Sequence, residues 1–410
     1  MNPPESRGLR TAWLAVALLL PVALLNYLDR QMLAAMMDSV TADIPFGPDK
    51  KTQWGYMLGQ FKWVYAVLSP FGGYIADRFS RRYTICASLF CWSIITYATG
   101  QVTTYEGLLW TRTLMGISEA FYIPAALALI ADYHTGPTRS RAVGLHQTAI
   151  YCGVILGGFT GYIADEPRLG WRFAFDLTGL VGALYAIPLL FLLKDRPRAI
   201  DAAPPIKSAP WTSAYELLSN RSFILLVLYF TLPALAGWVV RDWMPAILRE
   251  QFGIGQGRAG VSATLFVNLA ALGGAFLGGW LADSAAKHNV RGRITVSAIG
   301  MSLLIPALFG IGNAGTLLVA IAFLMLFGLG WGFFDCNNMP ILAQIVRPHL
   351  RATGYGLMNF VSIGCGGFAD WGFGAMRDQG IPLNVIFGAF ASTALLSVGL
   401  VLLIRPGYKS

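Results

Sequence analysis

Apolar runs long enough to cross a lipid bilayer recur along the whole chain, each bounded by charged residues, glycine or proline. A membrane-spanning helix needs about 20 mostly apolar residues, because the hydrocarbon core is about 30 Å thick. With 55% hydrophobic and only 12% charged residues, the 410-residue chain is too apolar for a soluble globular protein. We therefore predict an all-α membrane protein with twelve transmembrane helices. The predicted spans are 12–36, 54–76, 83–101, 106–131, 142–164, 172–193, 223–247, 260–282, 294–312, 315–345, 353–373 and 383–404.

The chain also shows signs of internal duplication. Its longest polar connection, 194–221, is rich in proline and alanine and separates a six-helix bundle at 1–193 from another at 222–410. The sequence GGYIAD at 72–77 recurs as GGWLAD at 278–283, displaced by 206 residues. A second set of matches is displaced by 216 residues: Gly116 and Gly332, Glu119 and Asp335, Pro124 and Pro340. We expect two pseudo-symmetric bundles joined by a cytoplasmic linker, an architecture in which secondary transporters place their site between the repeats.

The basic residues indicate topology rather than a nucleic-acid partner. A net charge of +9 would suit nucleic acid in a soluble domain, but here Lys and Arg lie mostly in short loops. Nineteen of them lie on the side of the N-terminus, seven on the other side and four within spans. This bias predicts that both termini are cytoplasmic. The first span has no small-residue cleavage site, so we expect it to be retained as a helix.

No metal site, cofactor or enzymatic activity is expected. The four histidines lie near loops without an HExxH pattern, and the five cysteines fall in apolar segments without metal-ligand spacing. The sequence motifs of nucleophile elbows and phosphate loops are also lacking.

The fourth predicted span contains two opposite charges, Arg112 and Glu119, in a stretch otherwise typical of lipid-buried helix. Seven residues are almost two turns, so both side chains lie on nearly one face, with Gly116 between them. An ionisable group at bilayer depth costs at least about 2.5 to 3.5 kcal/mol, and it usually faces a protein interior or a watery cavity on an ion or substrate pathway. The alternative is a buried ion pair that only joins two helices.

Between the second and third spans, the segment 73–82 resembles the GxxxDRxxRR signature of the major facilitator superfamily. The matching residues are Gly73, Asp77, Arg78, Arg81 and Arg82. The resemblance implies the twelve-helix fold of that family and a cytoplasmic gate at these residues. In physical terms, Gly73 would allow close helix approach, and Asp77 would pair with basic groups and hold the inner gate in one state. For Arg81 and Arg82 the alternative is a topological anchor with no role in gating.

Further stretches are similar to the anion:cation symporter branch of that superfamily, which includes sialin and the bacterial galactonate and hexuronate transporters. They are NYLDR at 26–30, the Arg and Glu of the fourth span, and DWMPAIL at 242–248. The resemblance implies that arginines bind the substrate carboxylate and that acidic residues carry protons. These roles fall on Arg30 and Arg112, and on Asp29 and Glu119. We expect Asp29 to pair with Arg112 when no substrate is bound, and an anionic sugar to compete for that arginine.

Other polar residues within spans are candidates for the substrate site. Lys62 interrupts the second span, where it would bind an anion or extend to the membrane surface. Asn337 and Asn338, close to Asp335 in the tenth span, suit a polyhydroxylated ligand because an amide offers donors and acceptors. Their alternative role is polar contact between helices. The predicted substrate-binding set is Tyr27, Arg30, Lys62, Arg112, Gln147, Tyr151, Asn337 and Asn338, and the predicted proton-coupling set is Asp29, Glu119 and Asp335.

Together these features predict a secondary transporter that carries an organic anion, of the sugar-acid or acidic-saccharide class, with protons by alternating access. The expected partners are the small anionic solute, protons and the lipid bilayer, with no nucleic acid. The expected state is a monomer in the inner membrane of a bacterium. Two alternatives share the fold. One is an organophosphate/phosphate antiporter, a branch that carries a second arginine where this chain has Gly237, and the other is a transporter-like sensor.

Overall fold

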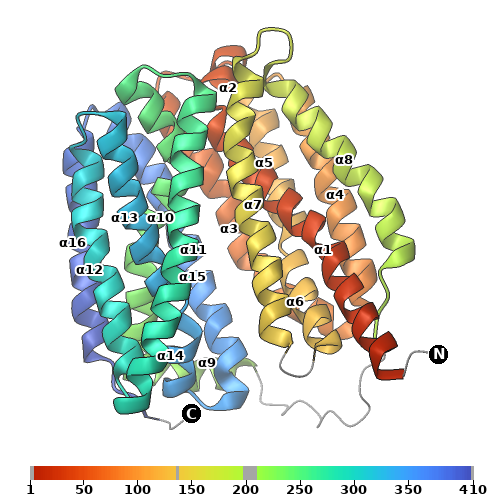
Figure 1. Cartoon of the computed structure of the whole chain (residues 1–410). Coiled ribbons are helices and arrows are strands. Elements are labelled where there is room, and N and C mark those ends of the chain that lie inside the picture. Colours follow the sequence, from red (N-terminus) through yellow and green to blue (C-terminus); the bar gives the residue numbers. More distant parts are fainter. Residues whose placement is uncertain (1–3, 135–137, 197–209, 408–410) are drawn as a thin grey trace. The chain divides into compact units, whose positions relative to one another are not determined.

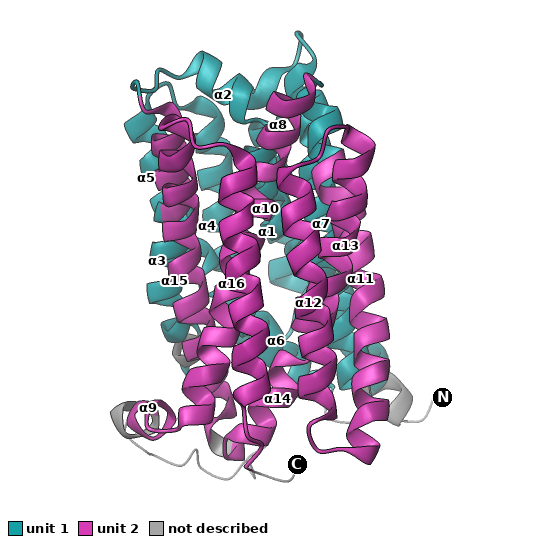
Figure 2. Cartoon of the chain, turned by 90° about the vertical axis from the view of Figure 1, so that its left-hand side faces the viewer, with its two compact units in different colours: residues 1–48, 60–203, 254–261 teal, residues 49–59, 204–253, 262–410 magenta. Residues whose placement is uncertain are grey.

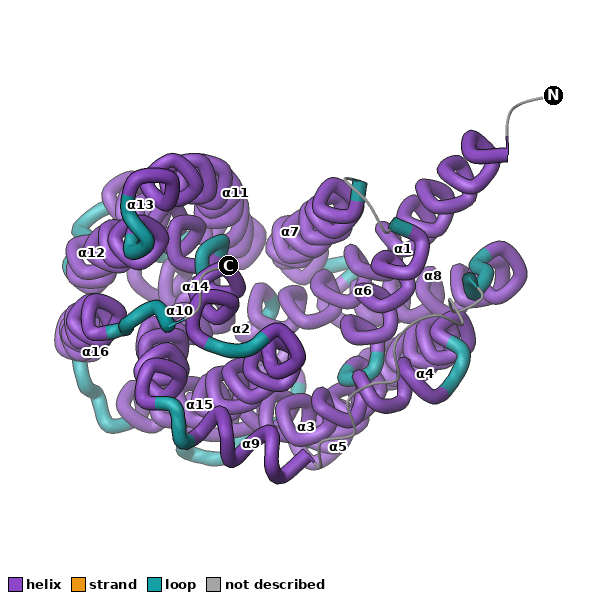
Figure 3. The backbone as a smooth tube through the Cα atoms, turned by 90° about the horizontal axis from the view of Figure 1, so that it is seen from below, coloured by secondary structure: helices purple, strands orange, loops and turns teal. Residues whose placement is uncertain are grey.

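The computed structural model describes residues 4–134, 138–196 and 210–407, which form helices and connecting loops without a β-strand (Figure 1, Figure 3). The helices are α1 (Pro4–Ala35), α2 (Met37–Asp43), α3 (Lys50–Arg78), α4 (Arg81–Gln101), α5 (Tyr105–Glu119), α6 (Tyr122–Tyr133), α7 (Arg139–Asp165), α8 (Gly170–Leu192), α9 (Pro210–Leu218), α10 (Arg221–Phe252), α11 (Gln256–His288), α12 (Gly292–Gly312), α13 (Leu317–Asp335), α14 (Asn338–Ile345), α15 (Arg351–Asp378) and α16 (Leu383–Leu403), with a short 3₁₀ helix, η1, at Pro348–Leu350.

Nine segments of the described residues are helical, long and apolar enough to cross a membrane. They coincide with nine of the predicted spans, and in two of them a pair of helices, α5 with α6 and α13 with α14, makes up the span. The other three predicted spans coincide with α3, α4 and α15, which have 29, 21 and 28 residues. These helices carry polar side chains along their length, and on α4 Ser93, Thr96 and Thr99 are buried. Helical structure is therefore present at every predicted span.

Two spans that we predicted as continuous helices are each interrupted in the structure. The first break separates α5 from α6 directly after Glu119, and the second separates α13 from α14 directly after Asp335. Pro124 and Pro340 favour the breaks, because proline has no backbone N–H and its ring clashes with the carbonyl four residues earlier, although Pro70 lies inside the unbroken helix α3. The two prolines are displaced by 216 residues, so the breaks occupy equivalent positions in the sequence repeat.

The chain divides into two compact units (Figure 2). Unit 1 comprises Met1–Pro48, Gln60–Ala203 and Ile254–Val261, and unit 2 comprises Asp49–Gly59, Pro204–Gly253 and Ser262–Ser410. Relative to the halves expected from the sequence, the start of α3 is assigned to unit 2 and the start of α11 to unit 1. Within the predicted linker 194–221, α9 forms a short helix of its own.

The core of unit 1 holds the helices that carry the charged residues. It is formed by aliphatic and aromatic side chains of α1, α4, α5, α6, α7 and α8. The rings of Trp92 and Tyr122 are fully buried there, with their centroids 5.4 Å apart in an edge arrangement. Because α1 packs against α7, and α4 packs against both α8 and α5, the polar positions of α1, α4 and α5 are held in a fixed arrangement.

Each unit contains a helix start that is capped by an aspartate from the end of another helix. In unit 1, Asp165 at the end of α7 accepts hydrogen bonds from the Gly257 N–H (2.9 Å) and the Gln256 side chain (3.1 Å) at the start of α11. In unit 2, Asp378 at the end of α15 accepts hydrogen bonds from the N–H and the hydroxyl of Thr52 (both 2.7 Å) at the start of α3. A carboxylate at this position satisfies N–H groups that have no partner within the helix.

Replacing Asp165 with alanine is expected to destabilise the protein by about 0.5 to 2 kcal/mol, because the start of α11 loses its cap. The measurement is the thermal unfolding temperature in detergent. Glu166→Ala is the matched control, since Glu166 is the next residue, is exposed and makes no side-chain hydrogen bond among the described residues. Equal shifts in the two variants would show that the loss of surface charge, and not the cap, causes the effect.

Candidate functional site

The principal charged contact of unit 1 joins α1 to α5. Arg30 Nε donates to Glu119 Oε2 at 2.5 Å, and the two residues are 89 positions apart in the sequence. The Glu119 side chain is fully buried and that of Arg30 is 13% exposed. Asn26, one turn before Arg30 on α1, is also fully buried and faces Glu119. The structure therefore brings together a predicted substrate-binding residue and a predicted proton-coupling residue.

Three aromatic rings surround the guanidinium of Arg30. Its central carbon lies 4.8 Å from the ring centroids of Tyr27 and Tyr65 and 4.9 Å from that of Phe61. Tyr27 precedes Arg30 by three residues on α1, while Phe61 and Tyr65 are one turn apart on α3. Aromatic faces attract a cation, so the rings fix the direction in which Arg30 points and stabilise its charge. Of these rings, only Tyr27 was predicted as a site residue.

Gly116 allows α5 to approach this aromatic group closely. A Cβ atom at Gly116 would lie 2.8 Å from the carbonyl oxygen of Phe61 and 3.1 Å from the Cβ of Val64. Any larger residue would therefore push α5 away from α3. The glycine between the two charges of the fourth span thus has a packing reason, and it sets the distance between Glu119 and the rings around Arg30.

Arg112 is a second buried guanidinium of unit 1, and no carboxylate of the described residues pairs with it. It is 3% exposed, and its Nη2 donates to the Thr99 hydroxyl at 3.2 Å. Its Nε is buried without a hydrogen-bond partner in the described part of the chain. Glu119 and Asp29 are the opposing charges that act on it through space. A desolvated cation with an unsatisfied donor is costly, and it is a favourable position for an anionic ligand.

Asp29 does not form the ion pair with Arg112 that the sequence led us to expect. Its Oδ2 accepts a hydrogen bond from the Thr96 hydroxyl at 3.0 Å, and its Oδ1 has no partner among the described residues. Asp29 is 1% exposed. Because Asp29 and Arg30 are adjacent on a helix, they diverge by about 100°, which directs Arg30 to Glu119 and Asp29 to α4. Thr96 and Thr99 were missed, although their spacing of three places both hydroxyls on one face of α4.

The other predicted residues of unit 1 differ in their surroundings. Lys62 is only 3% exposed, so its side chain lies within the protein, and its binding of an anion stays a prediction. Gln147 on α7 is exposed and Tyr151, one turn later, is half-buried. On the same helix His146 is 1% exposed and bonds to the Tyr122 hydroxyl at 2.9 Å. This corrects our description of the histidines as lying near loops, since His146 sits inside the helix core.

The basic residues of the predicted cytoplasmic gate make contacts within unit 1. Arg81 at the start of α4 forms an ion pair with Asp132 near the end of α6. The backbone N–H of Arg82 donates to Asp195 at 2.9 Å, just after α8, and its guanidinium donates to the Leu190 carbonyl. Arg78 is exposed. The surroundings of Gly73 and of the Asp77 side chain lie outside the described part of the structure, so the gate at those two residues stays a prediction.

Unit 2 contains two buried amides beside the break between α13 and α14. Asn337 is fully buried, and its Nδ2 donates to the Phe333 carbonyl at 2.9 Å, whereas its Oδ1 has no partner in the described residues. Asn338 is 2% exposed, and neither atom of its amide has a partner there. A buried amide without hydrogen bonds costs free energy, which makes the pair a candidate ligand contact. Asp335, three residues before Asn338, is exposed.

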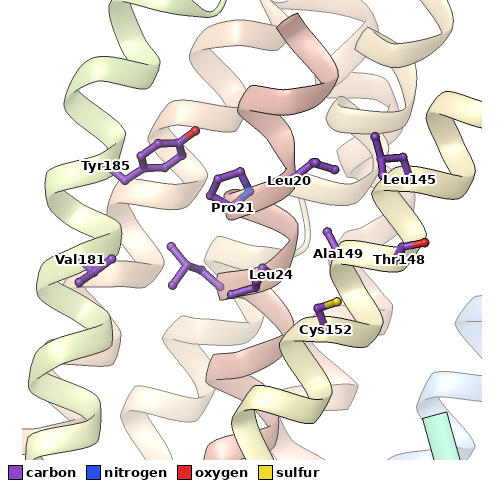
Figure 4. A pocket seen from close by; sticks show the side chains of 10 residues that line it. Leu20, Pro21, Leu24, Leu145, Thr148, Ala149, Cys152, Val181 and Tyr185 are labelled. Carbon is purple, nitrogen blue, oxygen red and sulfur yellow. The ribbon is translucent and has the colours of Figure 1, made fainter. Parts of the chain in front are cut away.

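Figure 4 shows a cavity of about 550 Å³ in unit 1, bordered by α1, α7 and α8. None of its lining residues is charged, and neither Arg112 nor Asp29 is among them. An apolar cavity of this kind does not suit a charged solute. The lining residues are Leu20, Pro21, Leu24, Leu25, Leu145, Thr148, Ala149, Cys152, Val181 and Tyr185.

Comparison with known proteins decides the family. The sequence model of the Major Facilitator Superfamily matches residues 19–369, which is most of the chain. The chain belongs to this superfamily. It is therefore a multi-pass membrane protein that transports small solutes, and not an enzyme. The superfamily prediction is confirmed, while the assignment to the anion:cation symporter branch remains a prediction.

Two relatives differ in their sequence identity to this chain and in how much of it they cover. Protein spinster homolog 1 of Homo sapiens is 31% identical over 251 residues, which cover 59% of this chain and 47% of that protein. The matched region thus spans about half the length of these curated relatives. An MFS-type efflux pump of Mycolicibacterium smegmatis is 27% identical over 380 residues, covering 92% of this chain and 86% of the pump.

Solved structures show the same fold at low sequence identity. A bacterial homolog of the human lysosomal transporter spinster, in an inward-facing and unoccupied conformation, has a TM-score of 0.76 at 20% identity, covering 98% of this chain and 95% of that chain. A D-xylose–proton symporter has a TM-score of 0.75 at 16% identity, covering 96% of this chain and 98% of that chain. At these identities the likeness establishes the fold alone.

Proposed function

We propose that this chain takes up an organic anion, of the sugar-acid class, together with protons across the cytoplasmic membrane of a bacterium. In this proposal it acts as a monomer by alternating access, with both termini in the cytoplasm. The observation that carries the proposal is Arg112, a guanidinium that is 3% exposed and has no carboxylate partner among the described residues.

An anionic solute would supply what Arg112 lacks. A guanidinium presents its N–H groups in a planar fork that a carboxylate can accept with two hydrogen bonds. In Arg112 the Thr99 hydroxyl occupies Nη2, while Nε is left unsatisfied in the described structure. Arg30 is less available, because Glu119 already accepts its Nε. We therefore assign the solute carboxylate to Arg112 and a supporting role to Arg30.

Proton coupling would follow from the charge that the solute brings. Asp29 is buried and accepts a hydrogen bond from Thr96, and the positive charge of Arg112 acts on it through space against the effects of burial and of Glu119. When a solute carboxylate neutralises Arg112, this stabilisation weakens and protonation of Asp29 becomes more favourable. Binding of the anion and binding of a proton would then support each other, which is the thermodynamic requirement for symport.

The buried amides of unit 2 favour a sugar acid over a simple dicarboxylate. Asn337 and Asn338 together offer one unsatisfied carbonyl oxygen and one complete unsatisfied amide in the described structure. An amide can both donate to and accept from a hydroxyl group, so these side chains match a polyhydroxylated solute.

The phosphate antiporter alternative has a structural argument against it. At Gly237, where that branch carries a second arginine, a Cβ atom would lie 2.5 Å from the ring of Trp331. The aromatic ring thus fills the space that an arginine side chain would enter. We retain the antiporter and the sensor as outcomes that an uptake assay would reveal.

Uptake into proteoliposomes tests the proposal, with radiolabelled D-galactonate and D-glucuronate as probes and with or without a pH gradient. We expect a pH gradient to drive accumulation by the parent protein. Asp29→Asn is expected to lose this accumulation while it keeps exchange of labelled for unlabelled solute, because the anion site is intact but the proton site is absent. Asp49→Asn, at an exposed loop position, is the control. Full pH-driven accumulation by Asp29→Asn would remove Asp29 from the mechanism, and phosphate-dependent exchange in place of proton-driven uptake would support the antiporter.

A further inference from the structure

Two threonines of α4 lie against the two charges that the proposed function uses most. Thr96 and Thr99 are both fully buried. They are three residues apart on a helix, so their hydroxyls share one face about one turn apart. Thr96 contacts Asp29 and Thr99 contacts Arg112. A carboxylate and a guanidinium that could have paired directly are thus held on neighbouring hydroxyl groups instead.

The two hydroxyls are used in opposite senses. Thr99 Oγ1 donates to the Ile95 carbonyl at 2.8 Å, so its oxygen is the acceptor for Arg112. Thr96 Oγ1 instead donates to Asp29 Oδ2. A hydroxyl can donate one hydrogen bond, and a threonine in a helix often donates it to the backbone carbonyl one turn earlier. Thr96 therefore donates a hydrogen bond to the carboxylate of Asp29, and Thr99 accepts one from the guanidinium of Arg112.

We propose that Thr96 is a positioning residue that sets the proton affinity of Asp29 and that, with Thr99, it keeps Asp29 from forming an ion pair with Arg112. The inference rests on the proposed function, in which Asp29 carries the proton. The hydrogen bond from Thr96 stabilises the ionised carboxylate, while Oδ1 remains without a partner in the described residues and can accept the proton. Arg112, held apart, keeps its Nε for the solute anion.

Other groups around Asp29 do not replace this contact. Arg112 and Glu119 on α5 act on Asp29 through space, with opposite signs. Thr178 on α8 is close enough to stabilise ionised Asp29 as well, but its hydroxyl donates to the Ala174 carbonyl at 2.8 Å. The buried Tyr122 on α6 and His146 on α7 bond to each other rather than to Asp29. Among the described residues, Thr96 therefore makes the hydrogen bond that most directly distinguishes ionised from protonated Asp29.

The test measures protonation of Asp29 directly and needs no transported solute. The carboxylic-acid C=O stretch is followed against pH by infrared difference spectroscopy on the full-length protein in lipid, and the Asp29 band is identified by its loss in Asp29→Asn. Thr96→Val keeps the shape of the side chain but removes the hydroxyl. We expect the midpoint of the band to move to higher pH by about one unit or more, because a hydrogen bond to a charged group is lost. Thr96→Ser should restore the parent midpoint.

Thr99→Val is the matched control, since it removes the same hydroxyl one turn away on the same helix face. We expect its effect on the Asp29 midpoint to be much smaller than that of Thr96→Val. An unchanged midpoint in Thr96→Val, or equal shifts in the two valine variants, would overturn the positioning role and leave the proposed function standing. If the parent protein shows no titrating band that Asp29→Asn removes, Asp29 carries no proton, and both the inference and that part of the proposed function fail.

Discussion

Replacing Arg112 with lysine is expected to raise the KM for exchange of a sugar-acid anion about 100-fold, equivalent to about 3 kcal/mol of binding free energy. Lysine keeps the positive charge but cannot present two parallel N–H groups to a carboxylate. It also cannot reproduce the contact from Nη2 to Thr99 while still reaching the solute. Solute exchange in proteoliposomes is the appropriate measurement, because it requires no net proton movement and reports the anion site alone.

The control for this substitution is Arg139→Lys, at an exposed position at the start of α7, which is expected to leave the KM unchanged. If Arg112→Lys exchanged the anion with the parent KM, the solute would not depend on the planar guanidinium, and Arg112 would be a structural residue held by Thr99. If both arginine variants lost exchange equally, the loss would reflect general instability of the protein.

Replacing Glu119 with glutamine is expected to reduce the free energy of unfolding by about 3 kcal/mol, because Arg30 keeps its charge in a largely buried position without a carboxylate partner. Glu119 is fully buried and bonds to Arg30 Nε at 2.5 Å. The rings of Tyr27, Phe61 and Tyr65 offset only part of the loss, since a cation–π contact contributes about 0.5 to 2 kcal/mol. Unfolding in detergent micelles measures the change.

A double-mutant cycle separates the ion pair from simple loss of packing. Arg30→Leu combined with Glu119→Gln removes both charges, and we expect the double variant to be more stable than Glu119→Gln alone. Additive effects of the two substitutions would mean that the 2.5 Å contact contributes nothing beyond its two separate side chains. That result would also remove the reason for assigning Glu119 a structural role beside its predicted role in proton coupling.

Much of the fold was predictable from hydropathy and from the repeat. Helices occur at all twelve predicted spans, because a backbone in lipid must satisfy its polar groups within each span. The two helix breaks were missed, although Pro124 and Pro340 matched each other in the repeat. A proline lowers the stability of a helix locally, but whether it bends or interrupts the helix depends on the neighbouring packing, which a single sequence does not specify.

The site was predictable as a set of residues but not as a set of contacts. The presence of Asp29, Arg30, Arg112 and Glu119 in apolar spans marked them as unusual, and the structure buries all four wholly or mostly. Which of them would pair could not be deduced, since pairing depends on how α1, α4 and α5 rotate about their axes. The sequence pattern also cannot distinguish a polar residue with a functional contact from an ordinary polar residue within an apolar helix, which is why Thr96 was missed.

Unit 2 gives a second case in which the sequence does not show which polar side chain is buried. Asn338 and Asp335 are three residues apart and were both predicted as site residues, yet the first is 2% exposed and the second is exposed. Local sequence offered no reason to separate them, because both are short polar residues beside the same proline. The break after α13 lies between them, and only the three-dimensional structure shows which of the two side chains is buried.

The interruption after Glu119 divides the fourth predicted span into two helices, and the second of them, α6, has only 12 residues. Pro124 already removes one of the backbone hydrogen bonds that would tie the pieces together, so a tilt of α6 costs less than bending an intact helix of the same length. The equivalent interruption leaves α14 as a piece of 8 residues. In the proposed alternating-access cycle, α6 and α14 would be the segments that tilt, while Glu119 and Asp335, at their junctions with α5 and α13, stay in place.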